Sequence, residues 1–497
     1  MREYVAAIDQ GTTSTRCILF DLEGRPAAAA QREHRQIFPR PGWVEHDPIE
    51  IKERVDEVAA QALRAAPPGR VLAIGITNQR ETVVAWDARD GRPAANAIVW
   101  QDTRTEAECR AAIERGWEVD VRARTGLPIS TYFSATKIQW LLDHANSVRE
   151  LAASGHLLLG TIDTWVIWNL TGGPRGGAHV TDPTNASRTL LCDLANLAWD
   201  PFLLERFGVP RKPLPAVRPS IAREPYGRTL SDSPFGAGVP VCGDLGDQQA
   251  ALAGQGCFSA GEAKNTYGTG SFLLEHVGEK PVASTSGLLS TAACALPGER
   301  AYALEGSVAV AGAAVQWLRD NLGLIGSAAE TETIAESVPD SGGVYFVPAF
   351  SGLFAPYWDM RARGAIVGLT HHANRAHLVR ATLESICFQS REVAESMAAD
   401  SSRPFTALKV DGGATANNFL MQLQADILGI PVVRPVVRET TALGAAYAAG
   451  LAARAFESTD QLRHLWKADR TFEPRWDEDR RETAFLGWKR AVERTRG

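Results

Sequence analysis

The feature that most constrains this chain is a local pattern that occurs once in each half: an apolar strand, a tight turn of glycine and threonine, and a second strand. The first copy predicts strands over residues 4–8 and 16–21 around a turn at 9–15. The second copy predicts strands over 264–267 and 271–275 around a turn at 268–270. The chain has 497 residues, so it is long enough for more than one domain. We therefore predict an internally duplicated molecule with two lobes, residues 1–253 and 254–497.

Strands and helices mix throughout both halves, which indicates an α/β or α+β protein. A third strand at 27–31 completes a meander, and a helix begins at Pro48 with Asp47 as its N-cap and Glu50 closing a capping box. Further strands are predicted at 71–77, 83–86 and 97–100. The second half predicts a helix at 376–397, a strand at 407–411, a helix at 416–428, a strand at 432–433 and an alanine-rich helix at 442–453.

Charge and cysteine content exclude several classes of protein. The formal net charge is −6 and no block of basic residues occurs, which argues against nucleic acid or an anionic membrane as the main partner. The 7 cysteines are odd in number and never form a CxxC pair, as in a reduced cytosolic protein. The apolar stretch at 4–8 ends at Asp9 and is too short for a signal peptide. We expect a cytoplasmic protein without membrane insertion.

The familiar nucleotide-binding motifs are missing, since no lysine follows a glycine and no GxGxxG fingerprint occurs. The two Gly/Thr turns are the remaining candidates, because their N–H groups and hydroxyls can face phosphate oxygens. Asp9 is placed to hold a hydrated Mg²⁺, and Arg16 to meet the terminal phosphate. Each turn alone also fits an ordinary hairpin that binds nothing. Their occurrence in both lobes favours phosphate binding.

Two further turns join a strand to a helix. The turn at 411–417 brings Gly412 and Gly413 where a purine or ribose can approach the backbone, with the amide of Asn417 nearby. It also fits a sharp turn that needs glycine for a positive φ. Asp247 lies at the start of a predicted helix, where it is either a simple N-cap or the carboxylate that receives a hydroxyl proton during phosphoryl transfer.

Arg80 and Glu81 directly follow the apolar strand at 71–77, and Trp100 ends a neighbouring strand. Such a pair is usually a surface ion pair of little energetic value. At the end of a buried strand, however, the arginine can donate to a polyol, the glutamate can accept from it, and an aromatic face can cover its carbon skeleton.

Taken together, these residues resemble the glycerol kinases of the sugar-kinase family, which shares the actin-like ATPase fold. The resemblance runs nearly from end to end through DQGTTSTR from Asp9, GWVEHDP, TNQRET from Thr77, WQDTR, GDQQAA, NTYGTGSF, SGLFAPYWD, ARGAIVGLT, DGGATANNFLMQ and TALGAAYAAGLA. It implies two ribonuclease-H-like lobes, each with a mixed sheet, and a cleft between them. It also implies Mg²⁺-dependent phosphorylation of glycerol by ATP to sn-glycerol 3-phosphate in glycerol catabolism, and a homo-oligomer, a dimer or a tetramer.

The resemblance also implies roles for individual residues. Asp247 is implied as the catalytic base, and Asp9 and Asp247 as the groups near Mg²⁺. The implied glycerol site consists of Arg80, Glu81, Trp100, Tyr132, Asp247, Gln248 and Phe272, with Trp100 and Phe272 as its apolar wall. The implied nucleotide site consists of Thr12, Thr13, Ser14, Arg16, Thr269, Gly312, Gln316, Gly413 and Asn417. Tyr132 fits core packing equally well.

Two other functions fit parts of the sequence. The first is a kinase for another polyol or a ketose such as xylulose, although such relatives usually differ at the TNQRET position. The second is an actin-like or chaperone-type ATPase clamp, which would leave Arg80, Glu81 and Trp100 without a purpose. The loop at 226–236 has no histidine and no clear Gly-Gly-x-Arg, so neither fructose 1,6-bisphosphate inhibition nor histidine phosphorylation, both known among relatives, is indicated.

Overall fold

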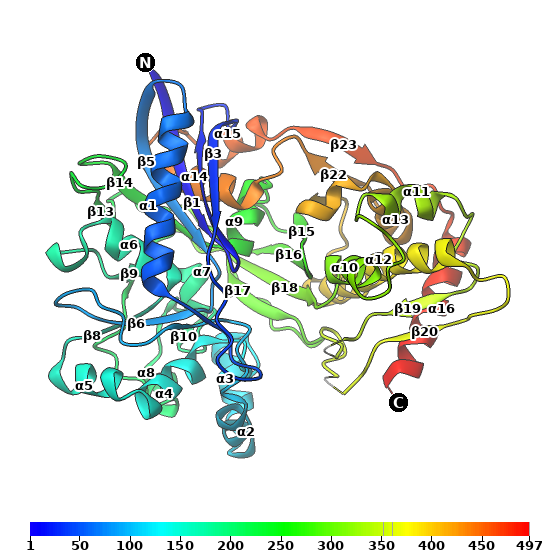
Figure 1. Ribbon diagram of the computed structural model, residues 1–497, viewed down its shortest axis with the longest axis horizontal. Coiled ribbons are helices and arrows are strands. Elements are labelled where there is room, and N and C mark those ends of the chain that lie inside the picture. Colours follow the sequence, from blue (N-terminus) through cyan, green and yellow to red (C-terminus); the bar gives the residue numbers. More distant parts are fainter. Residues whose placement is uncertain (351, 360, 497) are drawn as a thin grey trace.

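The computed structural model describes residues 1–350, 352–359 and 361–496, and it forms two lobes that lie side by side (Figure 1). Ser351, the first residue of the SGLFAPYWD motif, lies outside the described residues. Each lobe is built around a mixed β-sheet with helices packed on it, so the predicted α/β class and the mixed sheet in each lobe are confirmed.

The sheet of the first lobe has 6 strands in the order β13-β14-β5-β1-β2-β3. Its strands are β1 (Arg2–Gln10), β2 (Ser14–Phe20), β3 (Pro26–Glu33), β5 (Gly69–Asn78), β13 (Gly227–Arg228) and β14 (Pro240–Gly246). The predicted meander forms the antiparallel part, β1-β2-β3, whereas β5 and β14 add to β1 in parallel. The turn after β1 and the segments after β5 and β14 therefore leave the sheet at one edge.

Helix α1 (Pro48–Ala65) begins where the sequence predicts it. The side chain of Asp47 accepts a hydrogen bond from the backbone N–H of Ile49 at 2.9 Å, so the N-cap is confirmed. The predicted capping box is wrong, because Glu50 is engaged elsewhere: its carboxylate accepts from the backbone N–H of Arg35 and from the guanidinium of Arg54. The Glu50 carboxylate therefore binds these two groups instead of the backbone N–H of Asp47, which a capping box would require.

The first lobe also carries a second sheet and several further helices. The sheet has the order β4-β7-β6-β8, from β4 (Glu45–His46), β7 (Ala97–Ile98), β6 (Val83–Asp87) and β8 (Leu157–Thr161). The helices are α2 (Glu106–Glu114), α3 (Glu118–Thr125), α4 (Ser134–His144), α5 (Asn146–Ser154), α6 (Ile162–Leu170), α7 (Pro183–Ala186), α8 (Pro201–Arg206) and α9 (Asp247–Gly254). Short strands pair as β9 (Val180–Thr181) with β12 (Ala216–Val217) and as β10 (Cys192–Asp193) with β11 (Ala198–Trp199).

The main sheet of the second lobe has 7 strands in the order β17-β18-β16-β15-β21-β22-β23. They are β15 (Ala263–Tyr267), β16 (Ser271–Gly278), β17 (Leu289–Ala292), β18 (Tyr302–Val308), β21 (Leu408–Asp411), β22 (Val432–Pro435) and β23 (Ala468–Phe472). Its helices are α10 (Gly312–Asp320), α11 (Glu330–Glu336), α12 (Arg375–Ser401), α13 (Asn418–Leu428), α15 (Thr459–Leu465) and α16 (Glu478–Arg496), and β19 (Tyr345–Val347) pairs with β20 (Ala365–Val367).

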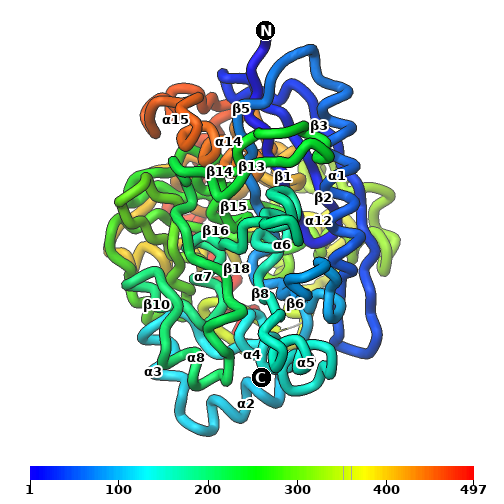
Figure 2. The backbone as a smooth tube through the Cα atoms, turned by 90° about the vertical axis from the view of Figure 1, so that its left-hand side faces the viewer, coloured from blue at the N-terminus to red at the C-terminus, as the bar shows by residue number. Residues whose placement is uncertain are grey.

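The second half of the chain also contributes to the first lobe. Helix α14 (Thr440–Ala452) lies against β1, β5, β14 and α9, and the side view shows it beside β5 and β14 (Figure 2). Its alanines belong to the same buried core as the strands of the first sheet. Close approach is possible because the facing strands carry glycine: a Cβ at Gly75 would lie 2.0 Å from the carbonyl oxygen of Ala445. The helix is apolar on all sides, as expected for an element buried all round.

Candidate active site

The strand register of the first sheet gathers three predicted site segments. Asp9 of β1 and Leu245 of β14 both lie opposite Thr77 of β5 in their respective pairings. The Gly/Thr turn after β1, the charged pair after β5 and Asp247 after β14 therefore leave neighbouring strands at the same level. Such an edge, at the carboxyl ends of parallel strands, is where α/β proteins bind their ligands.

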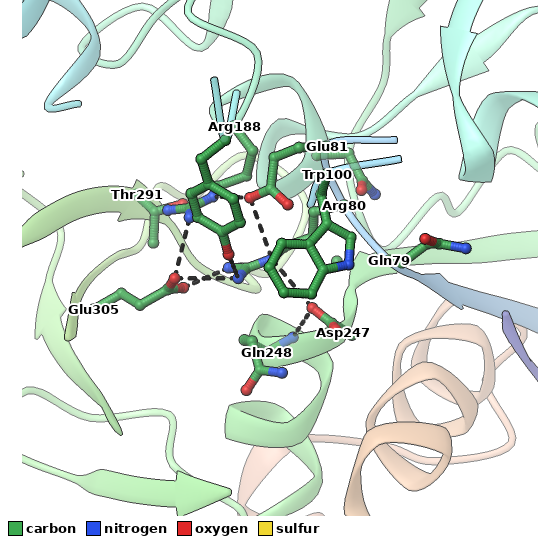
Figure 3. A network of polar contacts seen from close by, with 12 residues as sticks. Gln79, Arg80, Glu81, Trp100, Arg188, Asp247, Gln248, Thr291 and Glu305 are labelled. Carbon is green, nitrogen blue, oxygen red and sulfur yellow. Dashed lines mark hydrogen bonds and ion pairs between the residues drawn. The ribbon is translucent and has the colours of Figure 1, made fainter. Parts of the chain in front are cut away.

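Arg80 lies at the centre of a network of buried ionic contacts (Figure 3). Its Nε is 3.1 Å from a carboxylate oxygen of Asp247, and its Nη2 donates to Glu305 at 3.1 Å and to the hydroxyl of Tyr132 at 3.2 Å. Its Nη1 donates to the other carboxylate oxygen of Glu305. Gly246 makes room for this side chain, because a Cβ there would lie 2.7 Å from Arg80 Cγ.

Glu81 belongs to the same network through a second arginine. Arg188 Nε donates to Glu81 at 2.8 Å, and Arg188 Nη2 donates to Glu305 at 3.0 Å. The side chains of Arg80 and Glu81 are each only 2% exposed. The interpretation of this pair as a surface ion pair is therefore wrong. Although burial opposes it, the guanidiniums of Arg188 and Arg80 lower the pKa of Glu305 to about 2, so this carboxylate stays ionised.

Asp247 is the first residue of α9, and Gly246 occupies the N-cap position, so the simple N-cap interpretation is also wrong. The carboxylate accepts from the backbone N–H of Gln248 at 2.7 Å and faces Arg80. Its side chain keeps 30% exposure, the most of any carboxylate in the network, so a substrate can reach it. Burial raises the pKa of Asp247 and the positive charge of Arg80 opposes the rise.

The aromatic residues lie beside this network. The rings of Trp100 and Tyr132 meet edge to face at 5.4 Å, and the Tyr132 hydroxyl is held by Arg80. The indole N–H of Trp100 donates to the hydroxyl of Thr12 at 2.9 Å, which links the aromatic wall to the first Gly/Thr turn. Phe272 of β16 comes from the second lobe and is half-buried. The structure thus places Tyr132 with the predicted site residues.

Gln248 lies below Asp247, and its side-chain carbonyl accepts from Lys264 Nζ at 2.6 Å. Lys264 is fully buried on β15 and also donates to the Thr266 hydroxyl and to the backbone carbonyl of Phe272. Burial lowers the pKa of Lys264 to about 8. With its carbonyl engaged in this way, Gln248 has only its amide group left to offer a substrate.

The first Gly/Thr turn is closed by a hydrogen bond from the Gly11 N–H to the Ser14 carbonyl at 2.9 Å. Thr13 is exposed, whereas Ser14 is buried and its hydroxyl accepts from Gln31 at 2.9 Å. Arg16 pairs with Glu439 at 2.5 Å, next to the start of α14. Thr13 is therefore open to a ligand, whereas Thr12 is half-buried and already accepts from Trp100, and Arg16 must exchange Glu439 for a phosphate in order to bind one.

The second Gly/Thr turn packs against the start of α10. The N–H of Gly312 donates to the carbonyl of Gly268 at 3.0 Å, and a Cβ at Gly312 would lie 2.6 Å from that oxygen. Glycine is therefore required there for close approach. Thr269 and Gln316 are both exposed at this end of the lobe.

The turn after β21 lies beside the second Gly/Thr turn, because Asp411 pairs with Thr266. Gly412 has φ +91°, and a Cβ there would lie 2.4 Å from the Tyr267 carbonyl, so this glycine is structural. Gly413 is different, since nothing lies within 4 Å of its would-be Cβ. Asn417 is the N-cap of α13 and also donates to the Thr331 hydroxyl at 3.0 Å.

Asp9 and Asp247 suit a magnesium ion that also binds phosphate. Desolvation raises the pKa of Asp9 to about 7, Arg16 opposes the rise, and the negative charge of Asp247 adds to it. Two carboxylates that repel each other in this way gain from a cation between them. Across the described residues no group of three or more His, Cys, Asp or Glu is arranged to enclose a metal. Mg²⁺ needs no such cage, because it usually binds one or two carboxylates, waters and substrate phosphates.

Three charged residues of this region are absent from the sequence-based prediction: Arg188, Lys264 and Glu305. Each has no obvious motif around it. A charged residue within a buried apolar strand is nevertheless unusual, and it indicates a buried partner of opposite charge. Glu305 in the stretch YALEGSV carries that signal, whereas Lys264 in AKNTY lies among polar residues and does not.

Comparison with known proteins gives one family across most of the chain. Residues 4–254 match the FGGY family of carbohydrate kinases, N-terminal domain, and residues 263–453 match the C-terminal domain of the same family. A glycerol kinase from Mycolicibacterium gilvum is 56% identical over 499 residues, which cover 100% of this chain and 99% of the relative.

Solved structures agree with this result. The glycerol kinase of Plasmodium falciparum, crystallised with ADP, superimposes with a TM-score of 0.93 at 39% identity, covering 99% of this chain and 98% of the other. A xylulose kinase from Lactobacillus acidophilus gives a TM-score of 0.88 at 22% identity, over 99% and 98% of the two chains, and shows the shared fold alone.

Proposed function

The chain belongs to the FGGY family of carbohydrate kinases, and from this premise we propose that it transfers the γ-phosphoryl group of ATP to a terminal hydroxyl of glycerol, giving sn-glycerol 3-phosphate. The observation that carries the proposal is the buried pair of Arg80 and Glu81 facing the partly exposed Asp247. The ATPase clamp has no use for such a group of hydroxyl-binding side chains. A ketose kinase remains the second candidate, supported by the shared fold alone.

In this proposal the acceptor side binds every hydroxyl of a small molecule. Arg80 donates to the hydroxyls of glycerol, Glu81 accepts from them, and Tyr132 and Gln248 complete the contacts. Trp100 and Phe272 cover the carbon skeleton. A hydroxyl missing from the substrate leaves a hydrogen-bonding atom of a buried side chain without its substrate partner, which costs about 1–3 kcal/mol and thereby gives specificity.

Asp247 receives the hydroxyl proton. A carboxylate is a weak base toward an alcohol, but the transition state of phosphoryl transfer is loose, so the proton moves only after the phosphoryl group has largely left ATP. Positioning therefore matters more than basicity. The raised pKa of Asp247 adds modestly to its ability to accept the proton.

On the donor side, Thr12, Thr13, Ser14, Arg16 and Thr269 are proposed to hold the phosphates, and Gly312, Gln316, Gly413 and Asn417 the nucleoside. Asp9 and Asp247 are proposed to hold Mg²⁺, which when bound neutralises charge on the phosphates. The open space beside Gly413 supports this assignment, because a ligand can approach the backbone there.

We also propose that residues 1–253 form the lobe that binds the polyol and that residues 254–497, apart from α14, which packs in the first lobe, form the lobe that binds the nucleotide. A cytoplasmic homo-oligomer, a dimer or a tetramer, without nucleic acid or membrane insertion completes the proposal. The net charge of −6 supports the absence of nucleic acid as a partner. The free, buried state of all the cysteines supports a cytoplasmic location. Within the described residues no helix is long and apolar enough to cross a membrane.

The proposal is tested by incubating the purified protein with Mg-ATP and each of glycerol, xylulose and no acceptor, followed by identification of the product. We expect glycerol 3-phosphate from glycerol and little turnover otherwise. A faster reaction with xylulose would favour the ketose kinase. Slow hydrolysis that ignores the acceptor would favour the ATPase clamp.

A further inference from the structure

Glu305 is a buried carboxylate that reaches across the boundary between the lobes. It lies on β18, within the main sheet of the second lobe, where it pairs with Leu274 and Leu289. Its side chain is fully buried and contacts Arg80 and Arg188, which both belong to the first lobe. Arg80, which is proposed to bind the polyol, is thus held in place by a residue of the opposite lobe.

The strand that carries Glu305 also leads to the second Gly/Thr turn. Three residues further on, Val308 pairs with Ser271, the residue directly after that turn. The packing is close, because a Cβ at Gly270 would lie 2.5 Å from the Val308 carbonyl oxygen. One short strand therefore connects the anchor of Arg80 to the turn proposed to bind phosphate.

Arg80 has competing partners if Glu305 is lost. Its Nε already lies 3.1 Å from Asp247, and Glu81 lies 3.7 Å away. Arg188 already has one buried nitrogen, Nη1, without a hydrogen-bond partner in the described structure. Without the Glu305 carboxylate, both guanidiniums would turn toward Glu81 and Asp247, the groups that the substrate needs.

We propose that Glu305 is a positioning residue that keeps Arg80 and Arg188 oriented for the polyol and in register with the phosphate-binding turn. The inference rests on the proposed function, because that function assigns the binding of the polyol to Arg80 and Glu81. In this proposal Glu305 does not itself bind either substrate. It acts through the two arginines, which it supplies with charge and with a fixed direction.

The test compares Glu305→Gln with Glu305→Asp and with a matched control. Glu305→Gln keeps the shape and removes the charge, whereas Glu305→Asp keeps the charge but shortens the reach. The control is Glu275→Gln, a buried glutamate of the adjacent strand β16, whose partner on β18 is Leu304 rather than Glu305. Steady-state kinetics with glycerol and with Mg-ATP, thermal unfolding and ADP binding by calorimetry are measured for each variant.

We expect Glu305→Gln to raise the KM for glycerol and to lower kcat, each by about tenfold or more, while the KM for Mg-ATP and the affinity for ADP change by less than about twofold. Glu305→Asp is expected to recover part of the loss, and Glu275→Gln to behave like the wild-type protein. A purely structural role would raise both KM values together or lower the melting temperature equally in Glu305→Gln and Glu275→Gln, and either result overturns the inference.

The wild-type assay separates the two proposals. If the wild-type protein phosphorylates glycerol but Glu305→Gln has normal kinetics, the inference is wrong and the proposed function stands. If the wild-type protein does not phosphorylate glycerol, the proposed function fails and the inference fails with it.

Discussion

The proposed acceptor side and the proposed donor side of the site are built in opposite ways. On the acceptor side, Arg80, Glu81, Arg188 and Glu305 are nearly or fully buried and bind one another through charged groups. On the donor side, Thr13, Thr269, Gln316 and Gly413 are exposed, and the turns depend on glycines that allow close backbone contact. A small polyol needs several prearranged charged partners, whereas a triphosphate is bound by N–H groups and hydroxyls of simple turns.

This difference predicts that substitutions on the acceptor side change the kinetic parameters for glycerol, and that substitutions on the donor side change the KM for Mg-ATP. Asp247→Asn tests the point where the two sides meet, and the largest effect is expected there. Loss of the proton acceptor should lower kcat by about 10²–10⁴-fold. Binding of ADP, measured by calorimetry, should stay within about threefold of the wild-type value. Turnover near that of the wild-type protein would remove Asp247 from the role of base.

Glu81→Gln should give the next largest effect. The substitution keeps the shape but leaves Arg188, now 2.8 Å from Glu81, with a weaker partner, and it removes the charged acceptor for a hydroxyl. We expect kcat/KM for glycerol to fall by about 10–100-fold, since an unpaired buried group costs about 1–3 kcal/mol. The KM for Mg-ATP should change by less than about twofold. An equal rise in both KM values would contradict the separation of the two sides.

The donor side is tested by two neighbouring glycines with different surroundings. The side chain added by Gly413→Val enters open space, so the protein should keep its melting temperature. The same side chain would occupy the space proposed for the nucleoside, so the KM for Mg-ATP should rise by about fivefold. Gly412→Ala meets the Tyr267 carbonyl at a positive φ, so it should destabilise the fold by about 1 kcal/mol or more. Differential scanning calorimetry and kinetics distinguish these outcomes. A lower melting temperature for Gly413→Val would show a structural role for Gly413 as well.

Much of the fold could be predicted from local signals. The two strand–turn–strand units and the start of α1 follow from glycines, a Pro at the first helical position and an N-cap. These signals act over a few residues, so one sequence is enough to find them. The place of α14 could not be found this way, because it depends on contacts between residues several hundred positions apart, such as Gly75 and Ala445.

The same limit explains which parts of the site were missed. Asp247, Arg80 and Glu81 lie within three residues of the ends of their strands, so their shared edge could be predicted from the strand pattern. Arg188 joins the network from a distant part of the first lobe, and Glu305 joins it only because the two lobes meet, and no local pattern describes either contact. The capping box at Glu50 failed for a different reason, because local competitors, the guanidinium of Arg54 in the same helix and the backbone N–H of Arg35, bind the carboxylate instead.

The smallest effect expected is on stability, at Asp9 on the donor side. Its pKa rises from the ordinary value of 3.8 to about 7 in the folded chain, so the folded state holds its proton more tightly than the unfolded state. Stability is therefore lost as pH rises from about 4 through 7. Asp9→Asn removes this loss. Because Asp9 is only half-buried, we expect a gain of about 1 kcal/mol above pH 7, which should shrink toward pH 4.

Chemical unfolding of the ligand-free protein at pH 4.5 and at pH 8 measures this gain. Addition of Mg-ADP should reverse the order of the two proteins at pH 8, because a cation held by Asp9 and Asp247 stabilises only the wild-type chain. This result would show that the ionised Asp9 lowers the stability of the free protein and raises the stability of the protein bound to Mg-ADP. A gain of equal size at both pH values would instead mean that the ionisation of Asp9 carries no such penalty.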